Sequence, residues 1–279
     1  MKKIKKIILM ATAIVLLLPG KTAFAKNNMV PDYEVKLFLD SGLVLNSDNE
    51  LKKTYRNMFD TGKDYTKITV AYADTEDLAF NLEGWTNRIR VKEDASEFEL
   101  TYKKRYSISN NDIDEALNRA NIEGFDKSDT NYEAQIDWGY HNMTLSLSRK
   151  KTVSNKGYDD LELPKKSRML AILKDEMPGK EQDWKEDGWG TSLITDAKKF
   201  GDVQYKKYGG TYEGIDIDIE IWEIRGSDSG IEYITELSFK EDTYEEAAEK
   251  RSTMINALDS MGILLHEDSL KTQKILNSY

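Results

Sequence analysis

The sequence predicts an α+β protein in which antiparallel strands pack against amphipathic helices. Several segments alternate apolar and charged residues at period two, the pattern of strands with one apolar and one polar face. Two other segments carry apolar residues at helical spacing behind capping residues. The strands form either a sheet with one solvated face or a closed barrel whose charged faces line the lumen. Helices would cover the apolar outside of such a barrel.

The first third of the chain predicts two strands before its most highly charged stretch. In residues 32–39, the polar residues Asp32, Glu34 and Lys36 alternate with apolar ones. Residues 67–74 alternate in the same way. A polar segment at 48–60 between these strands is typical of a helix.

A charged hairpin follows within residues 72–106. A polar cluster at 92–97 separates two alternating runs. A turn centred on Asp94 and Ala95 would place Arg90 opposite Glu99 and Arg88 opposite Thr101. One face then carries four cations together with one acid and one hydroxyl: Arg88, Arg90, Glu99, Thr101, Lys103 and Arg105.

This basic face has two interpretations. Like charges on one strand face repel, so four neighbouring cations indicate a bound anion or carboxylates from adjacent strands. The alternative is an ordinary solvated sheet face. The first interpretation suggests a phosphate site.

The middle of the chain predicts a helix, two strands and a helical insertion. Ser109 is expected to cap a helix over 110–120. Residues 132–138 and 143–149 alternate as strands. Residues 152–204 contain an amphipathic helix, and we interpret them as an insertion between strands. Trp184 and Trp189 there either stack a ligand or pack the insertion on the barrel.

The last part of the chain predicts three strands and two helices. The strands are 203–208, 214–224 and 232–240. The acidic stripe of the second, formed by Asp216, Asp218 and Glu220, either binds calcium or is a solvated face. Thr243 is expected to cap a helix over 244–261, whose first turn is acidic as the helix dipole favours. A final helix is expected over 268–276.

The N-terminus is typical of a secretory signal peptide. Basic residues at 2–6 precede an apolar run at 7–18 and a small-residue site at 23–25. We expect cleavage after Ala25 and export to the extracellular space or cell envelope. Residues 26–279 would then form one domain with no stable membrane insertion.

Charge and composition restrict the partners. The net charge is −10, and loss of the five Lys in residues 1–25 would bring it to about −15. Such an acidic chain binds nucleic acid or anionic membrane poorly, so we expect no nucleic-acid partner. A small anionic phosphate ligand would need a local basic pocket. The absence of Cys excludes disulfides and thiol catalysis, and the oligomeric state is not predicted.

Three segments in order resemble the CYTH superfamily of triphosphate tunnel metalloenzymes. Asp32-x-Glu34-x-Lys36 resembles its opening E-x-E-x-K signature. Residues 72–90 resemble its Y-D-T…L…G…R-I-R segment, and residues 99–105 resemble its E-L-T-x-K strand. The resemblance covers residues 32–106 and returns more weakly over 203–262. It implies an eight-stranded antiparallel tunnel in which Mg²⁺ or Mn²⁺ assists hydrolysis of a triphosphate.

The resemblance also implies site residues. Glu34 and Lys36 would be catalytic. The implied phosphate ligands are Lys36, Arg88, Arg90, Lys103 and Arg105, with Arg149 and Lys206 as looser matches. The implied metal ligands are Asp32, Glu34, Asp218, Glu220 and Glu236. Two departures weaken the metal site, because Asp32 is one methylene shorter than Glu and Ser238 stands where family members often place a second acid.

Together these features favour an exported metal-dependent phosphohydrolase acting on a triphosphate or polyphosphate compound inside a charged tunnel. The alternative is a non-catalytic binding protein of the same fold for a phosphorylated or anionic ligand at the cell envelope. A structural envelope protein with a solvated sheet face is a third interpretation. His141 and His266 have no zinc-site spacing, and no G-x-S-x-G elbow supports a serine hydrolase.

Overall fold

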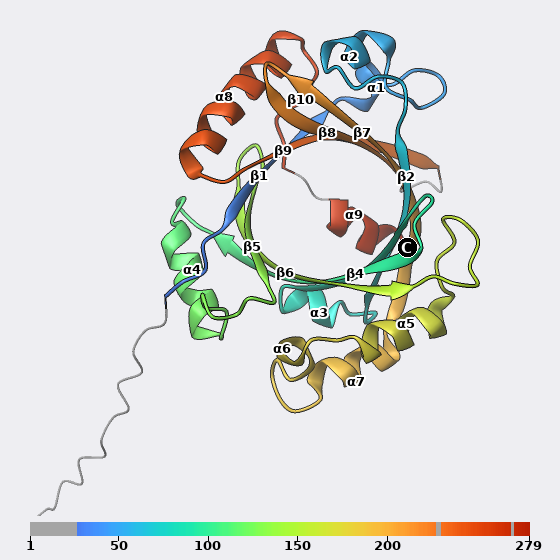
Figure 1. The fold of residues 1–279 in the computed structure, drawn as a ribbon, viewed down its shortest axis with the longest axis vertical. Helices are drawn as coiled ribbons and strands as arrows, with labels where there is room; N and C mark the ends of the chain where they lie inside the picture. The colour runs from blue at the N-terminus through green and yellow to red at the C-terminus, as the bar shows by residue number, and fades with distance from the viewer. Residues whose placement is uncertain (1–26, 227–229, 269–270) are drawn as a thin grey trace, which may run out of the picture.

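The fold is a closed β-barrel surrounded by helices (Figure 1). The computed structural model describes residues 27–226, 230–268 and 271–279. The proposed signal peptide and its cleavage site lie outside these residues.

The strands are β1 (Asp32–Leu39), β2 (Thr66–Asp74), β3 (Trp85–Lys92), β4 (Glu97–Ile108), β5 (Glu133–Trp138), β6 (Met143–Ser154), β7 (Lys198–Tyr212), β8 (Ile215–Arg225), β9 (Ile231–Glu241) and β10 (Leu264–Leu265). The helices are α1 (Ser41–Val44), α2 (Lys53–Met58), α3 (Ala79–Leu82), α4 (Ile113–Ile122), α5 (Lys166–Asp175), α6 (Gly179–Gln182), α7 (Trp189–Asp196), α8 (Tyr244–Ser260) and α9 (Lys271–Ser278).

The barrel wall contains nine strands among the described residues, in the order β1-β5-β6-β4-β3-β2-β7-β8-β9. Antiparallel pairing of β9 with β1 closes the ring, and the short β10 pairs with the end of β1. The prediction of eight strands, all antiparallel, is therefore wrong. Strand directions cannot alternate around a ring with an odd number of members, and β1 accordingly runs parallel to β5.

Alternation along strands such as β1, β4 and β8 separates a charged inner face from an apolar outer face. In β1, Glu34 and Lys36 line the lumen, whereas Val35 and Leu37 are fully buried in the main hydrophobic core. That core extends around the outside of the barrel beneath the helices. Of the two arrangements predicted for the strands, the closed barrel is the correct one.

The predicted helices α4 and α8 cover the barrel from outside (Figure 1). α4 begins at Ile113, capped by Asp112, and not at residue 110 behind Ser109. Asn110 and Asn111 adopt left-handed backbone conformations, with φ of 54° and 58°, which a right-handed helix cannot contain. The helix predicted over 48–60 is likewise limited to α2, because Asn49 and Asp60 have positive φ.

The segment predicted as a helical insertion contains α5, α6 and α7, which pack over β2, β3 and β7. Its first and last residues belong to strands, since β6 extends to Ser154 and β7 begins at Lys198. Trp184 packs edge-on against Trp85, with ring centroids 5.4 Å apart. Trp189 packs in the same manner against Phe80. Trp184 thus attaches the inserted helices to β3 of the barrel, and Trp189 attaches them to α3.

The C-terminal helix α9 differs from the others because it lies within the ring of strands (Figure 1). Its residues Ile275 and Leu276 are buried in a second hydrophobic cluster with Val70, Tyr205 and Trp222. One part of the lumen is therefore apolar and filled by a helix, which the alternating strand pattern did not predict. Among the described helices, none is long and apolar enough to cross a membrane.

Glu181 of α6 is an acid enclosed by the packed insertion, with no exposed side-chain surface. Burial raises the pKa of its carboxyl to about 8, and the nearby Asp74 acts in the same direction. Because an unfolded chain releases this proton near pH 4.5, folding should weaken as the pH rises from about 5 to about 8.

We predict that Glu181→Gln removes this pH dependence and stabilises the protein at pH 8.5 relative to wild type. The effect should be up to about 1.4 kcal/mol for each pH unit of the shift. Urea unfolding at pH 5 and pH 8.5 measures it. Glu186→Gln, an exposed acid just before α7, is the matched control. Equal pH dependence in wild type and Glu181→Gln would contradict the prediction.

Candidate functional site

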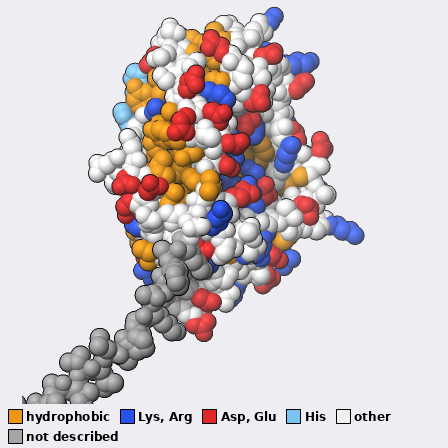
Figure 2. Space-filling model, turned by 60° about the vertical axis from the view of Figure 1, so that its left-hand side comes forward, with side chains coloured by type: hydrophobic (Ala, Val, Ile, Leu, Met, Phe, Trp, Pro, Cys, Tyr) orange, Lys and Arg blue, Asp and Glu red, His pale blue; other side chains and the backbone are white. Residues whose placement is uncertain are grey.

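The barrel encloses a cavity of about 490 Å³ whose wall is charged, with more basic than acidic side chains. In the view of Figure 2, acidic side chains surround a recess in which Lys and Arg atoms are visible. A second hollow, of about 750 Å³, shares Arg90, Tyr205, Lys207 and Asp218 with the first. Most of the residues predicted for the site line the first cavity: Glu34, Lys36, Arg88, Arg90, Lys103, Arg105, Asp218, Glu220 and Glu236.

The β3–β4 hairpin supplies a basic face to this cavity. Its register is the one predicted, with Arg88 opposite Thr101 and Arg90 opposite Glu99. Arg88 donates to the Thr101 hydroxyl at 2.9 Å, and the Arg90 guanidinium lies 2.8 Å from the Glu99 carboxylate. These contacts hold the two arginines side by side on the wall.

Further along β4, Arg105 and Lys103 have fewer anionic partners. Arg105 donates to the Thr86 hydroxyl at 2.6 Å and makes no ion pair with any described residue. Lys103 lies 3.7 Å from Asp137. Burial lowers the pKa of both groups, that of Lys103 to about 7, and the positive charges of Arg105 and Lys36 contribute to the shift of Lys103. This part of the wall holds more positive charge than its carboxylates neutralise.

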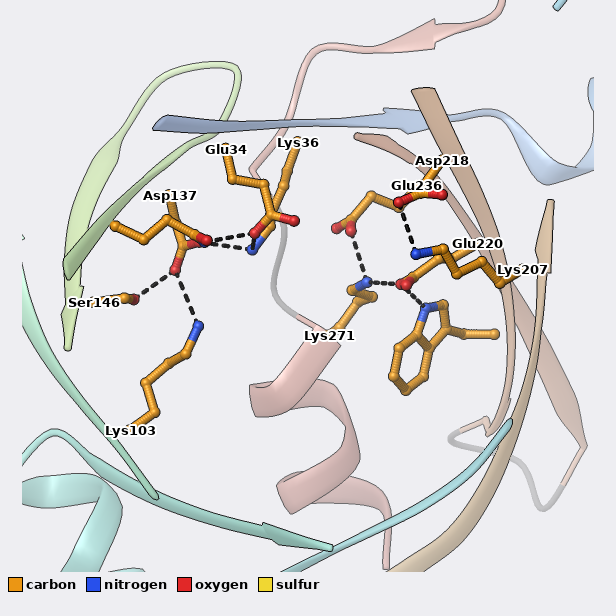
Figure 3. A network of polar contacts seen from close by, with 12 residues as sticks. Glu34, Lys36, Lys103, Asp137, Ser146, Lys207, Asp218, Glu220, Glu236 and Lys271 are labelled. Atoms are coloured by element: carbon orange, nitrogen blue, oxygen red, sulfur yellow. Dashed lines mark hydrogen bonds and ion pairs between the residues drawn. The ribbon is translucent and has the colours of Figure 1, made fainter. Parts of the chain in front are cut away.

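A first carboxylate pair, Glu34 of β1 and Asp137 of β5, lies next to Lys103 (Figure 3). The Lys36 ammonium lies 2.8 Å from Glu34 and 2.7 Å from Asp137. Gln135 and Ser146 also donate to the pair. Burial alone would lower the pKa of Lys36, but Asp137 and Glu34 more than offset this and raise it. Despite burial, the positive charges of Lys103, Lys36 and Arg105 hold the pKa of Asp137 well below its usual value.

A second carboxylate pair joins β8 and β9, where Glu220 and Glu236 are directly opposite in register. The Lys271 ammonium of α9 lies 2.8 Å from Glu220 and 2.7 Å from Glu236 (Figure 3). The indole of Trp222 donates to Glu220 at 2.8 Å. Asp218 is paired with Lys207 at 2.7 Å, so each acid predicted on these strands faces a lysine.

The arrangement does not fit a divalent metal as it stands. The described residues contain no group of three or more His, Cys, Asp or Glu side chains placed to hold a metal ion. In each carboxylate pair, a lysine ammonium lies between the oxygens that a hard cation would need. A metal could bind at either pair only after displacing that lysine.

Three predicted site residues lie outside the cavity. Asp32 is exposed at the start of β1. Arg149 and Lys206 follow the cavity-lining residues Ser148 and Tyr205, so strand alternation turns them to the outer face. There Lys206 donates to the backbone oxygen of Asn49 at 3.0 Å. The structure thus separates these three residues from the rest of the predicted site.

The structure also adds residues that the sequence analysis missed. Asp137 is the acid closest to Lys36, and the alternation of Glu133, Gln135 and Asp137 in β5 could have identified it. Lys271 had no comparable signal, because its partners are on strands some 35 and 51 residues earlier in the chain. Its position depends on α9 folding back into the barrel.

No family model matches the chain, and no curated protein matches it. Among solved structures, it is similar to a Hippeastrum protein described as a candidate adenylyl cyclase with a dominant triphosphatase activity. The two share 11% identity over 86% of this chain and 92% of that chain, with a TM-score of 0.52. A candidate adenylate cyclase from Bacillus halodurans has 14% identity over 89% of this chain and 98% of that chain, with a TM-score of 0.49. The chain therefore shares the closed-barrel fold of the Hippeastrum protein, which agrees with the tunnel fold that the CYTH resemblance implies.

We predict that Lys103 titrates near neutral pH, because burial and the neighbouring cations disfavour its charged form. The Cε chemical shift of ¹³C-labelled lysine, followed against pH, measures this. One resonance should titrate near pH 7 and be absent from Lys103→Arg. A wild-type spectrum in which every lysine titrates above about pH 9 would exclude the shift.

Proposed function

We propose that the tunnel binds a triphosphate or another short polyphosphate compound on the basic face of β3 and β4. The carrying observation is the cluster of four cations that line one wall of the cavity, Arg88, Arg90, Lys103 and Arg105, of which Arg105 makes no ion pair with any described residue. Buried cations of this kind are stabilised by an anionic ligand. Guanidinium groups also suit phosphate oxygens, because their paired N–H donors match the geometry of two oxygens.

The overall charge supports a specific ligand over general polyanion binding. The chain carries a net charge of −10, so a long polyanion would be repelled by most of its surface. A small phosphate compound could enter the cavity of about 490 Å³ and contact Arg88, Arg90 and Arg105 together. Nucleic acid remains an improbable partner on the same electrostatic argument.

Hydrolysis of the bound anhydride is the second candidate function. It is favoured by the shared fold with the Hippeastrum protein, which is described as having a dominant triphosphatase activity. Phosphoryl transfer depends mainly on positioning and charge neutralisation, and the basic face could contribute both. The catalytic roles of Glu34 and Lys36 and export after cleavage at Ala25 are parts of this proposal, and a Mg²⁺ or Mn²⁺ cofactor would have to displace Lys36 or Lys271 from its carboxylate pair.

We predict that Arg105→Met weakens binding of inorganic triphosphate by about tenfold to a hundredfold, the loss of one or two charge-assisted hydrogen bonds. Isothermal titration calorimetry at pH 7 measures the affinity. Lys206→Met is the matched control, since it removes one positive charge from the outer face of the same barrel. The idea fails if wild type binds no triphosphate, or if both variants weaken binding equally.

Phosphate release separates an enzyme from a binding protein. Inorganic triphosphate, ATP and pyrophosphate are each incubated with the purified chain in Mg²⁺, Mn²⁺ or EDTA. For an enzyme, Glu34→Gln should abolish metal-dependent release by removing one carboxylate of the first pair. Release that persists in this variant would remove Glu34 from the catalytic machinery. Triphosphate binding without release in any condition would identify a binding protein.

A further inference from the structure

Lys271 occupies an unusual position for a lysine, because it lies inside the barrel between two acids. Its ammonium lies 2.8 Å from Glu220 and 2.7 Å from Glu236, and its side chain is only 14% exposed. The ammonium also lies 4.5 Å from the centre of the Trp222 ring, a favourable cation–π distance. Glu236 is almost completely buried, with 2% of its side chain exposed.

The rest of α9 fixes this position. Ile275 and Leu276 pack into the apolar part of the lumen, and Tyr279 lies over the Arg225 guanidinium with 4.7 Å between group and ring centre. Lys271 is the first residue of the helix, so the positive end of the helix dipole also points toward the carboxylates. The packing of α9 against the barrel thus holds the lysine between the two acids.

The charge balance at this pair explains why a cation is needed. Glu220 and Glu236 face one another across neighbouring strands, where two like charges destabilise the sheet. Lys36 and Lys207 also act on Glu236 and Glu220, but removing the ammonium from between the two carboxylates would leave buried negative charge in excess, which is strongly unfavourable. In a metal-binding tunnel a divalent ion would meet this need, whereas here the ammonium does so.

We propose that Lys271 serves as a tethered cation which replaces a divalent metal at Glu220 and Glu236, so that the tunnel binds its anionic ligand without a metal. The inference rests on the proposed function. An ammonium has three N–H donors, and the two carboxylates account for two of them. Since Lys271 also lines the cavity, its third donor is available to an oxygen of the bound phosphate.

The proposal has a consequence that can be measured without any phosphate ligand. With Lys271 in place, added Mn²⁺ should change the melting temperature of the free protein little. In Lys271→Met, the acid pair that has lost its ammonium should capture Mn²⁺, and the melting temperature should rise clearly with the Mn²⁺ concentration. Lys274→Met is the matched control: it removes a lysine from the same helix, but one whose partner, Glu232, is outside this acid pair.

Triphosphate calorimetry provides the second measurement, with free ligand concentrations corrected for complexes with Mg²⁺. Wild type and Lys274→Met should bind inorganic triphosphate in EDTA within about threefold of their affinity in Mg²⁺. Lys271→Met should lose about tenfold or more in EDTA, the effect of one charged hydrogen bond and an unbalanced acid pair. Added Mn²⁺ should restore most of this loss.

The outcomes distinguish failure of the proposed function from failure of the role of Lys271. No triphosphate binding by wild type in either condition overturns the proposed function and this inference. Binding only with Mg²⁺ leaves the proposed function standing and overturns the role of Lys271. The role is also overturned if Mn²⁺ stabilises Lys271→Met no more than wild type. If Lys271→Met does not fold in EDTA, Mn²⁺ should restore its folded state, and failure to do so counts against the proposal.

Discussion

Backbone pairing between β1 and β9 is the interaction on which the rest of the structure depends. It turns a row of strands into a ring and gives every strand an inner and an outer face. The outer faces are apolar and are covered by helices such as α4 and α8. The inner faces place charges opposite one another in a confined space, where each must find a partner. Closure therefore creates both the hydrophobic core and the charged cavity.

The charges inside the ring are balanced in two different ways. On the β1, β5, β8 and β9 side, paired carboxylates surround the ammonium groups of Lys36 and Lys271 (Figure 3). On the β3–β4 side, Arg105 makes no ion pair with any described residue, and Lys103 shares Asp137 with Lys36. The first side is internally neutralised, whereas the second has more cations than nearby carboxylates, an excess that a bound anion would neutralise. This asymmetry is the physical basis for proposing where a phosphate compound binds.

The basic hairpin could be predicted in detail because its information is local. Its two strands are joined by a short turn, so the register that pairs Arg90 with Glu99 follows from counting residues. Counting residues does not predict which side chains meet when their strands are far apart in the sequence. Only the family resemblance places Arg149 and Lys206 in the site. Each lies one residue away from a position that faces the cavity, so its side chain is on the outer face of the barrel. The nine strand segments were visible in the sequence, while the number eight came from the resemblance and was wrong.

Periodicity in the chain determined which segments are strands, which face of each is polar, and that β3 and β4 present a basic surface. These properties depend on neighbouring residues and their side-chain alternation. Tertiary structure alone decided that β1 runs parallel to β5, that Asp137 meets Lys36, and that Lys271 enters the lumen between Glu220 and Glu236. Those contacts join residues far apart in sequence, and they arise only when ring closure and the packing of Ile275 and Leu276 bring β8, β9 and α9 together.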